Sequence, residues 1–287
     1  MQNFVRVFLA FASIQFAYAA SAEDLAADAR NKINLAGKQR TLIQQVAKAS
    51  CFARLDDEHA KAHHNEAAES IARFDRVLTG LRNGDEGLEL LPSEQPEVLA
   101  ALGEVEAQWA PFKDAALRSL EAGSGADAAF SRLVSTDMKL LAQMDETVGV
   151  VQTMNSASGG IDPNLAKTIN TAGRQRTLVQ QSAKAFCLKA VGVDPVSSAR
   201  QQAEAVQSFD AAMKALVAPR EDLVAPSSAI AKNLGRVDAI WQSLSTSYDA
   251  YDPDAPTASE DAAVIAAQNN RVLREMNRIV YMYALTQ

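Results

Sequence analysis

The sequence contains few of the residues that build β-sheets and catalytic centres. Aromatic side chains make up 6% of the 287 residues, and there are 3 histidines and 2 cysteines. Alternating β-branched segments are scarce and alanine is abundant, which favours helices over strands. No Gly-x-Ser-x-Gly, phosphate-loop, His-Glu-x-x-His or paired-carboxylate motif is present. We therefore expect a protein that is not an enzyme and carries no cofactor or metal.

Long apolar runs are also lacking, and the one apolar segment lies at the N-terminus. Residues 1–6 carry a positive charge, residues 7–16 are almost wholly apolar, and residues 17–19 (Ala-Tyr-Ala) suit signal peptidase. The apolar segment is shorter than the roughly 20 residues that a membrane-spanning helix requires. Residues 1–22 are therefore predicted to be a signal peptide, cleaved after Ala19 or Ala22, and the mature protein is predicted to be periplasmic. An uncleaved segment that anchors the protein in the membrane is the alternative.

The net charge of −7 disfavours nucleic acid and anionic membrane surfaces as partners. Acidic residues are nevertheless absent from two long windows, residues 31–55 and 164–193, each of which contains several lysines or arginines. Two cationic segments within an acidic protein indicate a small anionic ligand rather than a polyanion.

The same two windows contain an internal repeat. INLAGKQRTLIQQVAKASCF (residues 33–52) returns as INTAGRQRTLVQQSAKAFCL (residues 169–188), with 14 of 20 positions identical at a constant offset of 136. Weaker matches follow, such as Trp109 with Trp241, which we interpret as core anchors at matched positions. The chain is therefore predicted to be a tandem duplication.

Each copy is expected to form four antiparallel helices of about 25 residues joined by short connections, which is an up-down bundle. The first copy spans residues 23–155, a linker spans 156–162, and the second copy spans 163–287. The expected helices are 24–55, 59–81, 94–121 and 126–153, then 163–191, 196–217, 227–248 and 258–285. The predicted fold class is all-α, with two tandem four-helix bundles that form an internal pseudo-dimer, and we expect the chain to be a monomer.

The six mismatches in the repeat fall on one half of a helix, whereas the opposite half is identical in both copies. The identical stripe consists of Asn34, Gly37, Arg40, Thr41, Gln44, Gln45, Lys48 and Cys51, with their counterparts 136 residues later. Glycine within a helix costs about 1 kcal/mol relative to alanine, so Gly37 and Gly173 are expected to permit close backbone approach. We predict that the two first helices meet along this stripe across a pseudo-twofold axis.

At that axis Arg40 and Arg176 are expected to converge, with no carboxylate nearby. A guanidinium group offers a planar fork of donors, so two of them can clamp an oxyanion that relieves their mutual repulsion. The candidate ligand-binding residues are Arg40, Arg176, Asn34, Asn170, Gly37, Gly173, Thr41, Thr177, Gln44 and Gln180. A polar face that is simply hydrated on the outside of a bundle is the alternative.

Cys51 lies three helical turns after Arg40 and points in nearly the same direction, so it is expected to face Cys187. In an exported protein these two cysteines form either a disulfide or two buried free thiols, and both possibilities stay open. His59 and His63 have the spacing of a zinc-binding pair. The second copy has no histidine in the corresponding stretch, so we prefer a solvated face to a metal site.

The pattern I-N-x-A-G-x-Q-R-x-L-x-Q-x-x-A-K resembles the first-helix segment of the N-terminal domain of type IV pilus chemotaxis transducers (PilJ-like). That domain is related to the periplasmic sensor domain of the nitrate-responsive kinases NarX and NarQ. The resemblance implies a four-helix bundle that pairs through its first helices, with nitrate or nitrite held between them by an arginine that corresponds to Arg40 and Arg176. Here both copies lie in one chain.

The sequence therefore predicts non-catalytic, periplasmic binding and sensing of a small oxyanion, with nitrate or nitrite preferred. The ligand would lie between the two first helices, and its presence would be signalled to a membrane-bound transducer or sensor. The alternative is a structural or adaptor protein that docks onto a chemotaxis, pilus or sensor-kinase complex without a small ligand.

Overall fold

The computed structural model describes residues 21–55, 58–121, 123–218 and 221–286. The predicted signal peptide, apart from its last two residues, lies outside the described residues. The described chain forms eight α-helices and a short 3-10 helix, Glu86–Leu88, so the all-α prediction is confirmed. The helices are α1 (Ala22–Leu55), α2 (Ala60–Asn83), α3 (Pro96–Ser119) and α4 (Ala126–Ala157), then α5 (Pro163–Ala190), α6 (Pro195–Val217), α7 (Ser228–Ala250) and α8 (Ala258–Ala284). None of these helices is long and apolar enough to cross a membrane.

Local capping chemistry sets several helix boundaries. The Asp162 carboxylate accepts a hydrogen bond from the backbone N–H of Leu165 at 2.9 Å, which satisfies one of the free donors at the start of α5. Ser227 caps α7 in the same way through the N–H of Ile230. At the other end of the first repeat, α4 continues to Ala157, so part of the predicted linker is helical.

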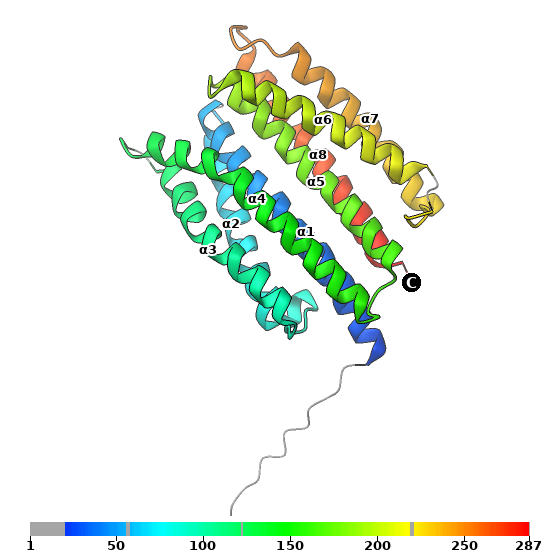
Figure 1. Ribbon diagram of the computed structural model, residues 1–287. Helices are drawn as coiled ribbons and strands as arrows, with labels where there is room; N and C mark the ends of the chain where they lie inside the picture. The colour runs from blue at the N-terminus through cyan, green and yellow to red at the C-terminus, as the bar shows by residue number, and fades with distance from the viewer. Residues whose placement is uncertain (1–20, 56–57, 122, 219–220, 287) are drawn as a thin grey trace, which may run out of the picture.

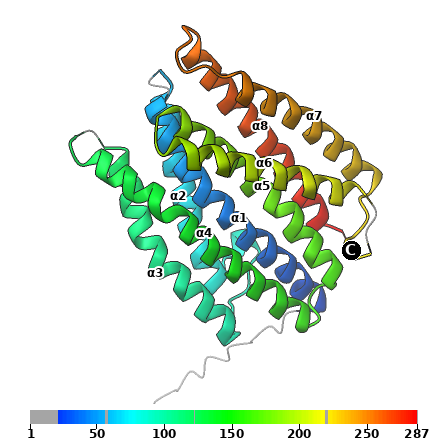
Figure 2. The ribbon, with the colours of Figure 1, turned by 45° about the horizontal axis from the view of Figure 1, so that its top comes forward.

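The first helices of the two repeats, α1 and α5, lie side by side where the two bundles meet (Figures 1 and 2). Oγ1 of Thr41 lies 3.2 Å from Oγ1 of Thr177. Cys51 and Cys187 form a disulfide, with their Cα atoms 6.1 Å apart. Because residues 136 positions apart face each other at both places, α1 and α5 run parallel and in register. The chain is therefore an internal pseudo-dimer, as predicted.

Matched aromatic side chains fill the two bundles. Trp109 stacks on Phe74 with ring centroids 3.7 Å apart, and its indole N–H donates to Asp75 at 2.7 Å. In the second repeat Trp241 stacks on Phe209 at 4.0 Å and donates to the equivalent aspartate at 2.8 Å. Each indole is thus buried with its polar atom satisfied, which makes the tryptophans core anchors, as predicted. The apolar core runs continuously through both repeats and fixes α1 against α5.

Candidate functional site

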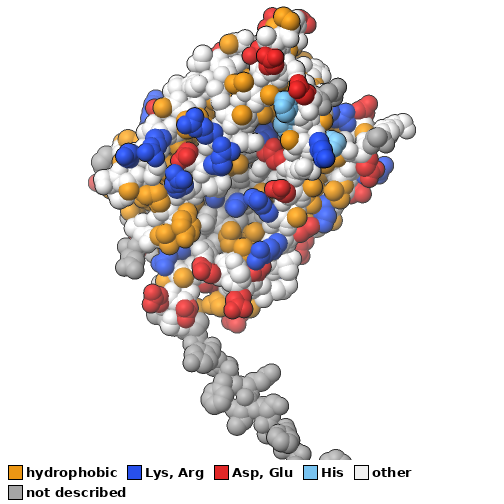
Figure 3. All heavy atoms as spheres, turned by 180° about the vertical axis from the view of Figure 1, so that it is seen from behind, with side chains coloured by type: hydrophobic (Ala, Val, Ile, Leu, Met, Phe, Trp, Pro, Cys, Tyr) orange, Lys and Arg blue, Asp and Glu red, His pale blue; other side chains and the backbone are white. Residues whose placement is uncertain are grey.

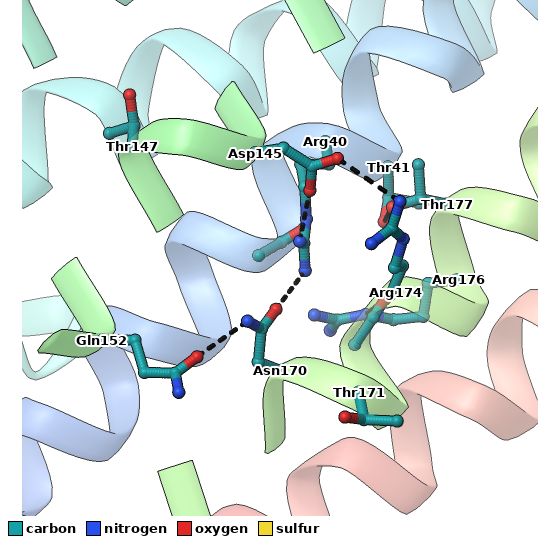
Figure 4. Close-up of polar contacts among 12 residues, drawn as sticks. Arg40, Thr41, Asp145, Thr147, Gln152, Asn170, Thr171, Arg174, Arg176 and Thr177 are labelled. Carbon is teal, nitrogen blue, oxygen red and sulfur yellow. Dashed lines mark hydrogen bonds and ion pairs between the residues drawn. The ribbon is translucent and has the colours of Figure 1, made fainter. Parts of the chain in front are cut away.

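Arg40 extends from α1 into the junction with α5 and is only 2% exposed. Its Nη1 forms an ion pair with Asp145 of α4 at 2.6 Å, and its Nη2 donates to Oδ1 of Asn170 in α5 at 2.8 Å (Figure 4). Asn170 in turn donates to Gln152 of α4 at 2.7 Å. Both bundles therefore hold the Arg40 guanidinium group in place.

Arg176 makes the reciprocal contact from α5 and is also 2% exposed. Its Nη1 donates to Oδ1 of Asn34 in α1 at 3.0 Å, and its Nη2 donates to the carbonyl oxygen of the same residue at 3.1 Å. A longer bond of 3.4 Å joins Nη1 to Oδ1 of Asn277 in α8. The two arginines therefore reach across the pseudo-twofold axis in opposite directions, and each binds the asparagine of the other copy.

The stripe glycines make room for the two guanidinium groups. A Cβ atom built on Gly37 would lie 3.3 Å from Nη2 of Arg40 and 3.6 Å from Nη2 of Arg176, and one built on Gly173 would lie 3.8 Å and 3.2 Å from the same atoms. No backbone atom of the facing helix comes within 4 Å of either position. The expectation of close backbone approach was therefore wrong, because the arginine side chains occupy that space.

The expectation that no carboxylate lies near the arginines was also wrong, because Asp145 approaches from α4. An offset of 132 residues relates α4 to α8, so Asn277 is the counterpart of Asp145 in the second repeat. Arg40 thus has a carboxylate partner, whereas Arg176 meets neutral amide oxygens. Among the described residues, no carboxylate oxygen lies within 4.0 Å of the Arg176 guanidinium.

This difference affects the proton affinities of the two arginines. Burial, followed by the charge of Arg40, lowers the pKa of Arg176 to about 9. Burial also lowers the pKa of Arg40, but the charge of Asp145 and its hydrogen bond oppose that effect. Arg176 is therefore the less well compensated cation, and an anion beside it would stabilise its charged form.

Two lysines of the stripe form a second charged layer further along α1 and α5. Lys48 is paired with Glu66 of α2 at 2.6 Å. Lys184 is paired with Asp137 of α4, and both of these side chains are 1% exposed. The identical lysines therefore receive their carboxylates from different helices of the first repeat.

The structure brings only part of the predicted site together. Around the pseudo-twofold axis lie Arg40, Arg176, Asn34, Asn170, Gly37 and Gly173. Thr41 and Thr177 bond to each other, while Gln44 and Gln180 donate away from the arginines, to Asp137 and to its counterpart Asn269. Asp145 and Asn277 were not among the residues predicted for the site. The offset of 132 that aligns Leu141 and Met144 with Leu273 and Met276 also aligns Asp145 with Asn277, so the sequence contained a signal for their equivalence.

The two histidines differ in exposure, since His59 is exposed just before α2, whereas His63 lies within α2 and is buried. His63 is 7% exposed, and its ring centroid lies 5.5 Å from that of Phe52, so the prediction of solvation was wrong for this residue. Within the described part of the chain, no group of three or more histidine, cysteine or acidic side chains is arranged to hold a metal ion.

A cleft of about 850 Å³ adjoins Arg40 on the surface formed by α4, α5 and α6. Its charged lining consists of Arg40, Arg174, Asp145 and Glu146. Arg40 and Arg174 both approach Asp145, at 2.6 and 3.8 Å. The formal charges of this lining cancel.

A second cleft of about 510 Å³ lies on the pseudo-symmetric surface formed by α1, α2 and α8. Its charged lining consists of Lys38, Arg73, Arg274, Glu66 and Glu69, and Asn277 forms part of its wall. Figure 3 views the molecule from the side opposite to that of Figure 1 and shows lysine and arginine side chains gathered around a hollow on this face. The two clefts are equivalent in position but differ in charge.

The fold and the site define a duplicated helical domain with a buried cationic interface. The family model for the N-terminal domain of type IV pili methyl-accepting chemotaxis transducers (PilJ) matches residues 25–133 and again residues 161–272. The two matches cover more than half of the chain, so the protein belongs to this family, whose N-terminal domain is a sensing domain. A search of the curated proteins found no match.

Proposed function

We propose that the protein is a non-catalytic sensor of a small oxyanion, with nitrate or nitrite preferred, which binds between α1 and α5 at Arg40 and Arg176. Membership of the transducer family supports a sensing role within a chemotaxis signalling system. The proposal includes export to the periplasm and a membrane-bound partner to which binding is signalled.

An unbalanced charge at the α1–α5 junction carries the proposal. The stripe contributes four buried cations, which are Arg40, Lys48, Arg176 and Lys184. Three of them have a carboxylate partner. Arg40 is paired with Asp145, Lys48 with Glu66, and Lys184 with Asp137. Arg176 has none among the described residues, and a buried charge without a counterion is unfavourable. One monovalent anion would complete the set.

The donors of Arg176 suit a small planar anion. They now bind the neutral oxygens of Asn34 and Asn277. Amide oxygens accept these hydrogen bonds but leave the charge of the guanidinium group uncompensated, whereas an oxyanion would accept the same bonds and add an ion pair. The fork of a guanidinium group matches two oxygens of nitrate or nitrite, which favours arginine over lysine at this position.

Calorimetric titration of the purified protein with nitrate, nitrite, sulfate and phosphate tests the proposal. We expect one of the first two to bind. Arg176→Ala should weaken binding by about ten- to a hundredfold, because it removes a charge-assisted contact of about 1.5–3 kcal/mol. Arg40→Ala should weaken binding as well, because it leaves the Asp145 carboxylate at the junction without its partner. Arg271→Ala, which alters an exposed arginine of α8, serves as the control and should bind normally. Binding that survives the loss of both stripe arginines would overturn the proposal.

The alternative is a structural or adaptor protein in which the stripe only joins the two bundles. It is favoured by the fact that asparagine and Asp145 oxygens already accept from both guanidinium groups. In that case the two alanine variants would lose the same stability with and without nitrate. A ligand-binding site predicts a difference instead, since nitrate at 100 times its Kd should stabilise only the binding-competent protein, by about 2.7 kcal/mol.

A further inference from the structure

The two repeats differ at the position where a carboxylate would meet each stripe arginine. Asp145 fills this position next to Arg40, and its counterpart next to Arg176 is Asn277. The exchange replaces a charged acceptor with a neutral one of the same shape. The internal pseudo-dimer is therefore symmetric in its first helices but not in the charge that surrounds them.

We propose that the anion is held on one side only, in the cleft between α1, α2 and α8, by Lys38, Asn277 and Arg176. On the opposite side, the carboxylate of Asp145 occupies the equivalent position permanently. This inference rests on the proposed function and specifies where, and in how many copies, the ligand binds.

The charges that line the α1–α2–α8 cleft support this assignment. Glu66 is bound by Lys48 at 2.6 Å, and Glu69 is bound by Arg73 at 3.5 Å. Within the described chain, no carboxylate lies within 4.0 Å of Lys38. Lys38 is also partly buried, and burial together with the charges of Arg176 and Arg73 lowers its pKa to about 8. It is therefore an available cation whose charged form an anion would stabilise.

Asn277 connects this cleft to the buried arginine. It lines the cleft and also accepts from Arg176. At 3.4 Å this bond is beyond the usual 2.7–3.2 Å range of a protein N–H···O bond, so its replacement by an anion loses little. The anion would then contact Lys38 from the cleft and Nη1 of Arg176 from within. In the other cleft Asp145 already makes the corresponding contacts with Arg40 and Arg174.

Mirrored substitutions test the inference, because each position has a counterpart in the other repeat. Asn277→Asp and Asp145→Asn exchange the two acceptors without changing their size. Lys38→Gln and Arg174→Gln remove equivalent cations from the two clefts. The probe is nitrate, or nitrite if the wild-type protein prefers it, and titration calorimetry gives both affinity and stoichiometry.

We expect one site per chain in the wild-type protein. Asn277→Asp and Lys38→Gln should each weaken binding by tenfold or more, whereas Arg174→Gln should bind as the wild-type protein does. Asp145→Asn should retain the original site and raise the stoichiometry towards two. Thermal unfolding of each variant without anion identifies any loss that results from misfolding.

Other outcomes would overturn the inference in distinguishable ways. Equal weakening by Lys38→Gln and Arg174→Gln would show a shared, symmetric site and would leave the proposed function standing. Weakening by Arg174→Gln but not by Lys38→Gln would place the anion in the opposite cleft. No binding of any tested anion by the wild-type protein would overturn both the inference and the proposed function.

Discussion

Replacing Asp137 by asparagine should destabilise the protein substantially. Asp137 of α4 and Lys184 of α5 are each 1% exposed and form an ion pair that joins the first repeat to the second. Asparagine retains the shape and one acceptor oxygen, but it leaves the ammonium group of Lys184 buried without a carboxylate. Removing one partner of a buried pair costs about 3–5 kcal/mol, and the remaining acceptor favours the lower end of this range.

Urea unfolding followed by circular dichroism measures this loss, with the disulfide intact in every variant. Glu69→Gln is the control, because Glu69 pairs with Arg73 on the surface, where the two side chains are 69% and 62% exposed. Such a surface pair contributes about 0–1 kcal/mol. The double variant Asp137→Asn/Lys184→Met removes both charges. It should recover most of the stability, since replacing a whole buried ion pair by neutral groups is often close to neutral.

Two results would refute this reasoning. One is a loss for Asp137→Asn no larger than that for the exposed control, which would mean that Lys184 finds water or another acceptor. The other is a double variant no more stable than Asp137→Asn alone, which would show that packing at Lys184, rather than its charge, determines the stability.

Stability in acid should depend on Glu66. Burial raises its pKa, but the charge of Lys48 and hydrogen bonds to the carboxylate outweigh burial and bring the pKa down to about 2 from its usual 4.5. The charged carboxylate therefore stabilises the folded protein above about pH 5, and this stabilisation is lost as the pH falls towards 2. Glu66→Gln should flatten the pH dependence of the free energy of unfolding in this range. The Cys51→Ala/Cys187→Ala double variant should lose about 2–5 kcal/mol in urea unfolding, as expected for a bond that closes a long loop, and thiol titration of the native exported protein should detect no free thiol. Gly37→Ala should weaken nitrate binding in calorimetry while changing stability by no more than about 1 kcal/mol, because the gain in helix propensity offsets the displacement of a guanidinium group that lies 3.3 Å from the new Cβ.

The sequence was sufficient to predict the helices and the pairing of α1 with α5, because both depend on patterns that the repeat displays twice. Helical spacing sorts the stripe onto one face, and identity at a fixed offset indicates that the face meets its own copy. The paired contacts of Thr41 with Thr177 and of Cys51 with Cys187 follow from that symmetry alone.

The counterions could not be predicted in this way, because they come from outside the repeated segment. The window around Arg40 contains no acidic residue, yet Asp145 reaches it from 105 positions along the chain. Local charge in a sequence describes covalent neighbours, whereas a buried cation is neutralised by whichever helix packs against it. His63 shows the same limit, since its burial depends on Phe52 at the end of α1.

The carboxylates that neutralise the stripe all belong to the first repeat. They are Asp145, Asp137 and Glu66, and the aligned positions of the second repeat hold Asn277, Asn269 and Gln201. If each repeat supplied the same acids, both arginines would be neutralised and neither would attract an anion. If neither repeat supplied them, four buried cations would repel one another across α1 and α5. The observed arrangement neutralises three cations and leaves Arg176 dependent on neutral amides. The proposed binding of an anion therefore depends on the difference between the repeats and not on the repeated stripe itself.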